Sequence, residues 1–521
     1  MVTHQMIMKF FIPMAFIALV GASFAVGQTP SAPDSALSEI LHNLSGTPLA
    51  LRQAVDYALK NATSVRRAEA QYAAAGGTER KESGFFDPQL FFNLTYQEQS
   101  QPMASFLAGA TTLSTRQTAS RTGVRMTLPI GTQLELGLNT LRLATNSQFA
   151  FLNPEYDAFG SVTVRQPLLG GLWVSARKQL VKSERESEAA KARYDQQVLA
   201  VHSDVERTYW DLYAAERDYA VQLLTRDRAK AFLNETELRA RTGLIGPNQV
   251  ASAKTFLAEQ ELQFLEREEQ LDHQSDLLAS LIGVRPDIGV TRFIPTDEPP
   301  SAVVVDSIDM LVDHALKNNL DLQAAQKDVE AARALAHAAN WEWLPSVNLV
   351  GSLGGYGLAG SPRNDTLSTP YIGNFDDALR SVSKREFPAW SVGVEVSIPI
   401  GFRSGLGEKD RLEAQVHGAE QRYIEQSRTL ADQVRATHRE LSHGTQRLKA
   451  ARDGVEAAQE QVRIGLIEFH NGRTTAFELV RLGEDFAVAQ RRYSEALVRT
   501  AKAAATLRQL TSGAYPSTTN H

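Results

Sequence analysis

The chain has 521 residues, a formal net charge of −6 and no cysteine. So slight a charge offers no broad basic surface to a nucleic acid, and the lack of cysteine excludes disulfides, thiolate metal sites and thiol catalysis. The length would accommodate several ordinary domains, but the internal repetition described below favours two related halves of one body.

Residues 1–27 are predicted to form a signal peptide. Lys9 precedes an apolar run from Phe10 to Val20, and small residues follow as far as Gly27. The run is too short to cross a bilayer as a helix, which favours cleavage before Gln28 over an uncleaved anchor, the alternative interpretation. Residues 28–48, rich in Ser, Pro and Ala, are predicted to be a flexible N-terminus of the mature chain.

The remaining chain repeats one unit twice. The segment Val55–Asn61 recurs as Val312–Asn318, and the same offset (312 − 55 = 257) pairs Pro88 with Pro345. A repeat of this length identifies the structural unit, which is a helix, strands and a long helical hairpin. The predicted organisation is a first repeat over residues 49–283, a linker over 284–304, a second repeat over 305–512 and a C-terminal tail over 513–521.

Alternating apolar residues predict β-strands in both halves. Such alternation over about 10 residues is typical of strands in a membrane barrel, whereas a small soluble sheet packed on helices is the alternative. Long polar or glycine-rich loops on one side, and a tight joint at Pro129–Gly131 on the other, favour the barrel. The predicted strands are Gln89–Gln99, Gly123–Leu128, Thr132–Leu143, Ser161–Gln166, Ser346–Leu353 and Ser391–Ile400, and the long loops are 100–120, 145–157 and 354–388.

Each half is also predicted to contain a very long helical hairpin. Residues from Trp173 to Arg241 include neither proline nor glycine. Apolar residues recur every seven positions at Val198, Val205 and Leu212, and intervening residues such as Val201 divide each interval into steps of three and four. This spacing indicates a coiled-coil seam on a helix about 100 Å long. The counterpart runs over 407–470. Glycine-containing turns then lead into returning helices over 248–282 and 475–510.

No motif in the chain supports an enzyme. The eleven histidines are scattered without metal-ligand spacing. The glycines between Gly351 and Gly357 resemble a nucleotide loop, but no helix begins after them, so we predict neither a metal site, a cofactor nor a catalytic residue.

The order and duplication of these elements resemble the TolC-like outer-membrane efflux proteins. The resemblance covers residues 49–513 and includes the joint Gln166–Gly170, which has a counterpart at Ile398–Gly401. It implies an α+β membrane protein with long periplasmic coiled-coil hairpins and outer-membrane strands that form one barrel shared by a homotrimer. It also implies a passive exit duct in outer-membrane lipid, partnered by a periplasmic adaptor and an inner-membrane transporter in an efflux pump or a type I secretion system.

The same resemblance assigns roles to the hairpin turns. Adaptor docking is expected at the periplasmic tips, at Thr242, Gly243, Leu244, Asn471, Gly472 and Arg473. In the family, acidic residues two turns beyond the second tip form a tunnel gate. Glu478 occupies that position, and Arg481 stands where a second acid is expected, so the charge of the gate stays open. A solvated surface charge is the competing interpretation of Glu478.

Two questions stay open from the sequence. The first half has 167 − 88 = 79 positions between its strand-flanking prolines and the second half 399 − 345 = 54, and the surplus surrounds Pro129. An added hairpin there would either enlarge the four-strand pattern of the family or lie outside the membrane. The alternative function is a periplasmic coiled-coil adaptor or scaffold, which would not account for the paired amphipathic strands.

Overall fold

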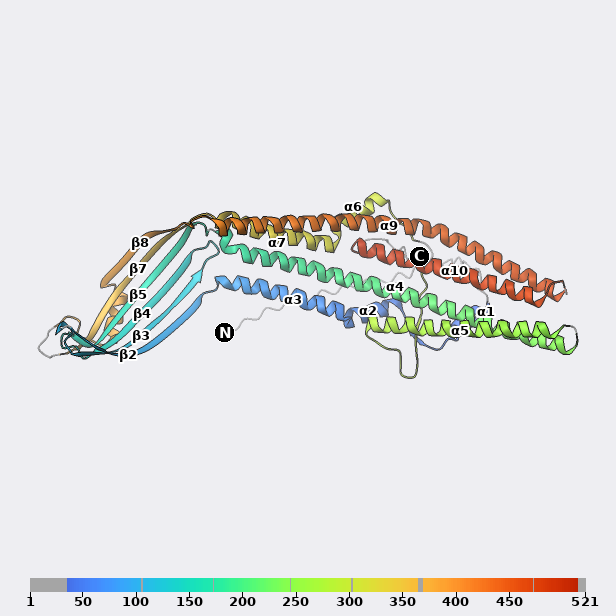
Figure 1. Ribbon diagram of the computed structural model, residues 1–521, viewed down its shortest axis with the longest axis horizontal. Coiled ribbons are helices and arrows are strands. Elements are labelled where there is room, and N and C mark those ends of the chain that lie inside the picture. Colours follow the sequence, from blue (N-terminus) through green and yellow to red (C-terminus); the bar gives the residue numbers. More distant parts are fainter. Residues whose placement is uncertain are drawn as a thin grey trace, which may run out of the picture.

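The computed structural model describes residues 35–513 except 105, 172, 244, 301–302, 364–368 and 472. The predicted signal peptide and residues 28–34 lie outside this part. The molecule is elongated, with a β-sheet at one end and a bundle of long helices extending from it (Figure 1). None of the helices in the described part combines enough length and apolarity to cross a bilayer.

The internal repeat is visible in the short helices of each half. In the first half α2 (Leu51–Asn61) leads into α3 (Thr63–Ser83), and in the second half α6 (Ile308–Asn318) leads into α7 (Leu320–Glu342). Each helix of the second half starts 257 residues after its counterpart in the first half, since 308 − 51 = 257 and 320 − 63 = 257. This is the offset of the sequence repeat. The helices break at Ala62 or Asn319, whose ψ angles of 121° and 127° are not helical, and the chain changes direction there.

Six antiparallel strands form one sheet, in which neighbours follow the order β2-β3-β4-β5-β7-β8. The predicted strands are therefore confirmed, but the predicted loops are too long, because β3, β5 and β7 extend well into them. Near the outer ends of these strands the alternation of apolar residues weakens, so the sequence pattern resembles a loop. The backbone nevertheless still pairs with the neighbouring strand there. The strands are β2 (Gln89–Pro102), β3 (Thr112–Thr127), β4 (Gln133–Thr145), β5 (Leu152–Leu169), β7 (Ser346–Pro362) and β8 (Phe387–Ser397).

Each half contributes one long helical hairpin. Helix α4 (Trp173–Arg241) has 69 residues and is followed by α5 (Pro247–Ile282); α9 (Arg403–His470) has 68 and is followed by α10 (Ala476–Leu510). Their bounds agree with the predicted hairpins to within four residues. Helix α4 is central, because it packs against α3, α5, α7 and α10.

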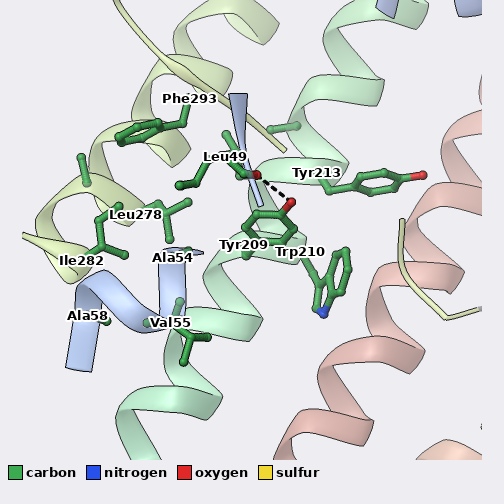
Figure 2. Close-up of a cluster of buried hydrophobic side chains, with 14 of the residues drawn as sticks. Leu49, Ala54, Val55, Ala58, Tyr209, Trp210, Tyr213, Leu278, Ile282 and Phe293 are labelled. Atoms are coloured by element: carbon green, nitrogen blue, oxygen red, sulfur yellow. Dashed lines mark hydrogen bonds between the residues drawn. The ribbon is translucent and has the colours of Figure 1, made fainter. Parts of the chain in front are cut away.

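The largest apolar core lies where α4 meets α2, α5 and the linker between the repeats. The predicted seam is buried at Val205 and Leu212 but accounts for only part of this core. Tyr209 and Trp210, on other faces of α4, are also buried, because the helix has neighbours on several sides (Figure 2). The core thus joins segments from both ends of the first repeat.

Small elements complete the fold. Strand β1 (Thr47–Leu49) pairs in parallel with β6 (Phe293–Pro295), so the linker closes back on the start of the first repeat. Helix α1 (Ser35–His42) packs on α4 through Leu37. The remaining elements are the 3-10 turns η1 (Gly84–Phe86) and η2 (Phe106–Ala108) and the helix α8 (Phe375–Lys384) between β7 and β8.

Candidate functional site

The turn between α4 and α5 is built around Gly243. Its φ of +76° is a left-handed conformation that strongly favours glycine, and its N–H donates to the Ala240 carbonyl at 3.0 Å. The Thr242 hydroxyl donates to the Arg239 carbonyl at 2.8 Å, and α5 then starts at Pro247. Leu244, a predicted docking residue, lies outside the described residues.

The turn between α9 and α10 is held by backbone hydrogen bonds. The Asn471 N–H donates to the Ile467 carbonyl at 3.1 Å, and the Arg473 N–H donates to the Glu468 carbonyl at 2.9 Å. The predicted docking residue Gly472 lies between them, outside the described part of the chain. These satisfied carbonyls end α9 and return the chain into α10.

Glu478 and Arg481 both lie in the first two turns of α10. The Thr475 hydroxyl accepts the Glu478 N–H at 3.3 Å, an N-cap that fixes the helix start. The Arg481 guanidinium donates to the Glu478 carboxylate at 2.6 Å along the same helix, and their side chains are 61% and 40% exposed. Within the single chain the two opposite charges are therefore paired with each other.

The two hairpin turns lie at the same end of the molecule, the end opposite the sheet (Figure 1). Gln260 of α5 donates a side-chain hydrogen bond to the Glu484 carboxylate of α10 at 3.3 Å, which joins the hairpins near their turns. Burial raises the pKa of Glu484, and the nearby acids Asp485 and Glu259 raise it further. The four residues predicted for docking that the structure describes are thus brought to one end, on two adjacent turns.

The sheet at the other end has two chemically different faces. Side chains alternate along a strand, and the strands stay in register except at two irregularities between β5 and β7. As a result, the inner half of one face is apolar across all six strands. The side chains of this face are mostly exposed in the single chain, with Leu90 80% and Trp390 74% exposed. Its members include Leu90, Phe92, Leu94, Val124, Leu136, Val162, Val164, Leu349, Leu353, Trp390, Val392, Val394 and Val396.

The opposite face of the sheet carries polar and charged side chains. Arg121 of β3 pairs with Glu135 of β4 at 2.6 Å, and Arg165 of β5 pairs with Glu395 of β8. Gln117 donates to the Gln97 side chain at 2.7 Å on the same face. A sheet that is apolar on one face and hydrogen-bonded on the other can separate lipid from water.

Comparison with known proteins gives the same architecture. The family model for outer membrane efflux proteins matches residues 311–513. The CmeC outer membrane channel of Campylobacter jejuni superposes with a TM-score of 0.62 at 14% identity, over 90% of this chain and 86% of that chain. The MtrE outer membrane channel of Neisseria gonorrhoeae gives 0.60 at 16% identity, over 91% of each chain. VceC of Vibrio cholerae gives 0.60 at 16% identity, over 89% of this chain and 96% of that chain.

A comparison with curated protein sequences gave no match. The family model covers most of the second repeat, and the first repeat has the same succession of helices, strands and helical hairpin. Residues 311–513 match the outer membrane efflux protein family, and the whole chain has the fold of the TolC-like outer membrane channels. The family match over the second repeat and the shared fold confirm the resemblance seen in the sequence.

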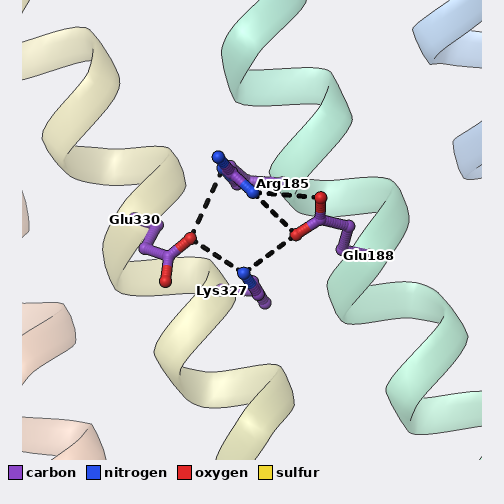
Figure 3. A network of polar contacts seen from close by, with 4 residues as sticks. All are labelled: Arg185, Glu188, Lys327 and Glu330. Atoms are coloured by element: carbon purple, nitrogen blue, oxygen red, sulfur yellow. Dashed lines mark hydrogen bonds and ion pairs between the residues drawn. The ribbon is translucent and has the colours of Figure 1, made fainter.

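Salt bridges hold the two repeats together near the sheet. Lys327 of α7 lies 3.0 Å from Glu188 of α4 and 3.0 Å from Glu330, and Arg185 of α4 reaches both carboxylates (Figure 3). The Lys327 hydrogen bond lowers the pKa of Glu188, and its two carboxylate partners raise the pKa of Lys327. Glu188 therefore stays ionised in mildly acidic conditions. Sequence spacing could not find this network, because its members come from helices about 140 residues apart.

Proposed function

We propose that three copies of this outer membrane efflux protein form one passive duct from the periplasm to the exterior. In this proposal the sheets close a shared barrel in the outer membrane, and the helices form a tunnel that extends into the periplasm. The observation that carries it is the two-faced sheet at one end of the molecule and the two hairpin turns at the other. The duct performs no chemistry of its own, and the transporter that it serves supplies the energy.

The apolar face of the sheet supports its contact with lipid. Large apolar side chains such as Trp390 and Val392 are more than two-thirds exposed in the single chain, an arrangement that a water-soluble protein avoids over so many strands. The polar face, with its arginine and glutamate pairs, then lines the water-filled lumen. A periplasmic adaptor or scaffold, the alternative function, would leave this apolar face in water.

The first test is the native mass of the protein extracted in mild detergent from separated outer membranes. A mass of three mature chains in the outer-membrane fraction is expected. A monomer or dimer in the soluble periplasmic fraction would contradict the duct and favour the adaptor.

We further propose that the two hairpin turns dock a periplasmic adaptor through Thr242, Gly243, Leu244, Asn471, Gly472 and Arg473. Gly243 and Gly246 offer a matched pair, because an added Cβ has no neighbour within 4 Å at either position and only Gly243 has a positive φ. Gly243→Val is expected to distort the turn and reduce export at least severalfold, with trimer assembly intact. Gly246→Val is expected to export normally. Normal export by both variants would contradict the proposed role of the hairpin turns in adaptor docking.

The pair of Glu478 and Arg481 is the proposed gate of the tunnel. Three copies of α10 around a threefold axis would bring three such pairs together. Arg481→Glu would replace each pair by two acids and is expected to shift the ion selectivity of the purified channel toward cations. Arg463→Glu, which makes the same charge change at another exposed ion pair, on α9, is the control. Equal reversal potentials for the two variants would contradict the gate.

A further inference from the structure

Within the described residues of the second repeat, the hairpin formed by β3 and β4 has no counterpart. Strand β2 corresponds to β7, since 346 − 89 = 257, and β5 and β8 both lead into a long helix. The surplus strands β3 and β4 therefore sit in the middle of the first repeat, where the second repeat has α8.

The extra hairpin runs the full height of the sheet. Strand β3 pairs with β2 from Gln89↔Arg125 at the inner end to Pro102↔Thr112 at the outer end, and β4 continues in register with β3 and β5. Its inner turn is tight, with the Leu128 N–H donating to the Thr132 carbonyl at 2.8 Å. The Thr132 hydroxyl also donates to the Gln166 side chain on β5, next to the joint that leads into α4.

In the inner half of the sheet, the apolar and polar faces continue through the extra hairpin. Val124 and Leu136 lie on the apolar face and are 36% and 57% exposed, whereas Arg121 and Glu135 pair on the polar face. Farther out the division ends, because Glu98 of β2 and Arg116 of β3 pair at 2.9 Å on the face of Leu90 and Val124. A hairpin that lay wholly in water beyond the membrane would have no reason to keep the division in its inner half. The outermost strands of the sheet are β2 and β8, so closure of a ring must pair these two edges between protomers.

We propose that β3 and β4 are part of the barrel wall, so that a trimer closes 3 × 6 = 18 strands. The proposal rests on the proposed trimeric duct. With strands about 4.8 Å apart and tilted by about 40°, 18 strands form a ring about 36 Å across between backbones, against about 24 Å for 12 strands.

The wider ring also matches the helices beneath it. Four helices per protomer (α3, α4, α7 and α9) join the sheet, so a trimer places 3 × 4 = 12 helices under the barrel. At spacings of about 9 to 10 Å these helices form a ring about 36 Å across between axes. The barrel therefore continues the tunnel without narrowing it. The membrane segment is not the size filter of this duct and admits bulkier solutes than a twelve-stranded barrel.

Single cysteines test the position of the hairpin, because the chain has none of its own. Leu136→Cys lies on the apolar face of β4 and Asn139→Cys on its polar face. With intact outer membranes and a membrane-impermeant maleimide, Asn139→Cys is expected to be labelled and Leu136→Cys protected until detergent is added. Labelling of both to the same extent would place the hairpin in water and overturn the proposal.

Val162→Cys and Thr163→Cys on β5 are the matched controls. Strand β5 belongs to the wall whether or not the extra hairpin does, so Thr163→Cys should be labelled and Val162→Cys protected. If these controls fail to alternate, the proposed membrane duct itself is wrong. If they alternate and the β4 pair does not, only the enlarged barrel is wrong.

Excision of residues 112–145 tests the width of the bore. The two ends of the hairpin meet at the outer rim, where the Gln148 N–H donates to the Gly109 carbonyl at 3.2 Å and the Ser147 hydroxyl donates to the Ala108 carbonyl at 2.8 Å. Their proximity allows β2 to pair directly with β5. In the Thr163→Cys background, polymer-linked maleimides of increasing size are expected to be excluded from the excised barrel and to enter the full one. The same size limit in both barrels would contradict the 18-stranded wall. If the excised chain fails to assemble, the cysteine-labelling experiment alone decides the proposal.

Discussion

Arg508 of α10 donates to the carboxylate of Glu206 on α4 at 2.6 Å, and the Glu206 side chain is only 8% exposed. The pair joins the last helix of the second repeat to the long helix of the first. Loss of one partner would leave the other charge buried without a counter-ion, which costs more than the pair itself contributes.

Arg508→Met is therefore expected to lower the free energy of unfolding by about 3 kcal/mol, a typical cost of breaking a buried pair. Chemical denaturation of the detergent-solubilised protein, followed by circular dichroism, measures the change. Arg463→Met is the matched control, because Arg463 and Glu460 are 63% and 52% exposed and such surface pairs contribute about 0 to 1 kcal/mol. Equal effects of the two substitutions would contradict a special role for the buried pair.

Glu216 of α4 gives the protein a pH-dependent stability. Burial raises the pKa of Glu216 to about 7, and Arg217 lowers it by a smaller amount. Because the folded pKa lies above the unfolded value, the folded state binds the extra proton. The Glu216 contribution is thus lost as the pH rises through about 4.5 to 7 and stays lost above it.

Glu216→Gln removes this titration. The variant is expected to unfold at a higher temperature than the parent at pH 8, with a stability gain of at most about 3 kcal/mol from the pKa difference, and to match it near pH 4.5. Thermal unfolding of both proteins across this pH range measures the difference. A parallel pH profile for parent and variant would show that Glu216 does not titrate as proposed.

Helix α8 rests on glycines at the outer end of the sheet. A Cβ added to Gly357 of β7 would lie 2.0 Å from the Ala378 carbonyl oxygen of α8, whereas at Gly393 of β8 it would meet nothing within 4 Å. Gly357→Val is therefore expected to displace α8 and expose the bonds after Lys384 and Arg385 to trypsin added from outside. Gly393→Val should be cleaved no faster than the parent. If Gly357→Val is cleaved by trypsin no faster than the parent, the proposed packing of α8 on Gly357 is wrong.

The helical hairpins could be predicted from the sequence because local signals define them. Glycine at the turn near Gly243, proline at the start of α5 and a long stretch without either residue fix the ends of α4 and α5 almost to the residue. The lengths of the strands were harder to predict from the sequence. The outer ends of β3 and β7 contain serine, threonine and glycine, which are typical of loops, and only pairing across the sheet makes them strands.

Long-range contacts of the candidate site were not accessible to sequence reasoning either. The hydrogen bond from Gln260 to Glu484 connects residues 224 positions apart, and no periodicity marks it. The continuation of the sheet through β3 and β4 likewise depends on register with β5, which an isolated pattern of alternation near Pro129 leaves undetermined.

Tyr209 is the polar centre of the core that closes the first repeat. Its hydroxyl donates to the Leu49 carbonyl at 2.9 Å and accepts the N–H groups of Thr296 and Asp297 at 3.0 and 3.1 Å, so it ties both β1 and the linker to α4 (Figure 2). Burial raises the pKa of Tyr209 to about 12, and the hydroxyl therefore stays protonated and able to donate at any physiological pH.

Tyr209→Phe keeps the ring in the core and removes only these hydrogen bonds. The Asp297 N–H would lose the hydroxyl as its partner, and the Thr296 N–H and the Leu49 carbonyl would keep only their mutual hydrogen bond at 3.2 Å. We therefore expect a loss of about 1 to 3 kcal/mol in the free energy of unfolding. The loss should be concentrated in the linker, so hydrogen exchange at Thr296 and Asp297 should accelerate more than exchange in α4. Tyr96→Phe is the control, since Tyr96 is 63% exposed on β2. Unchanged exchange in the linker would mean that β1 and β6 are held by the surrounding apolar contacts rather than by the Tyr209 hydroxyl.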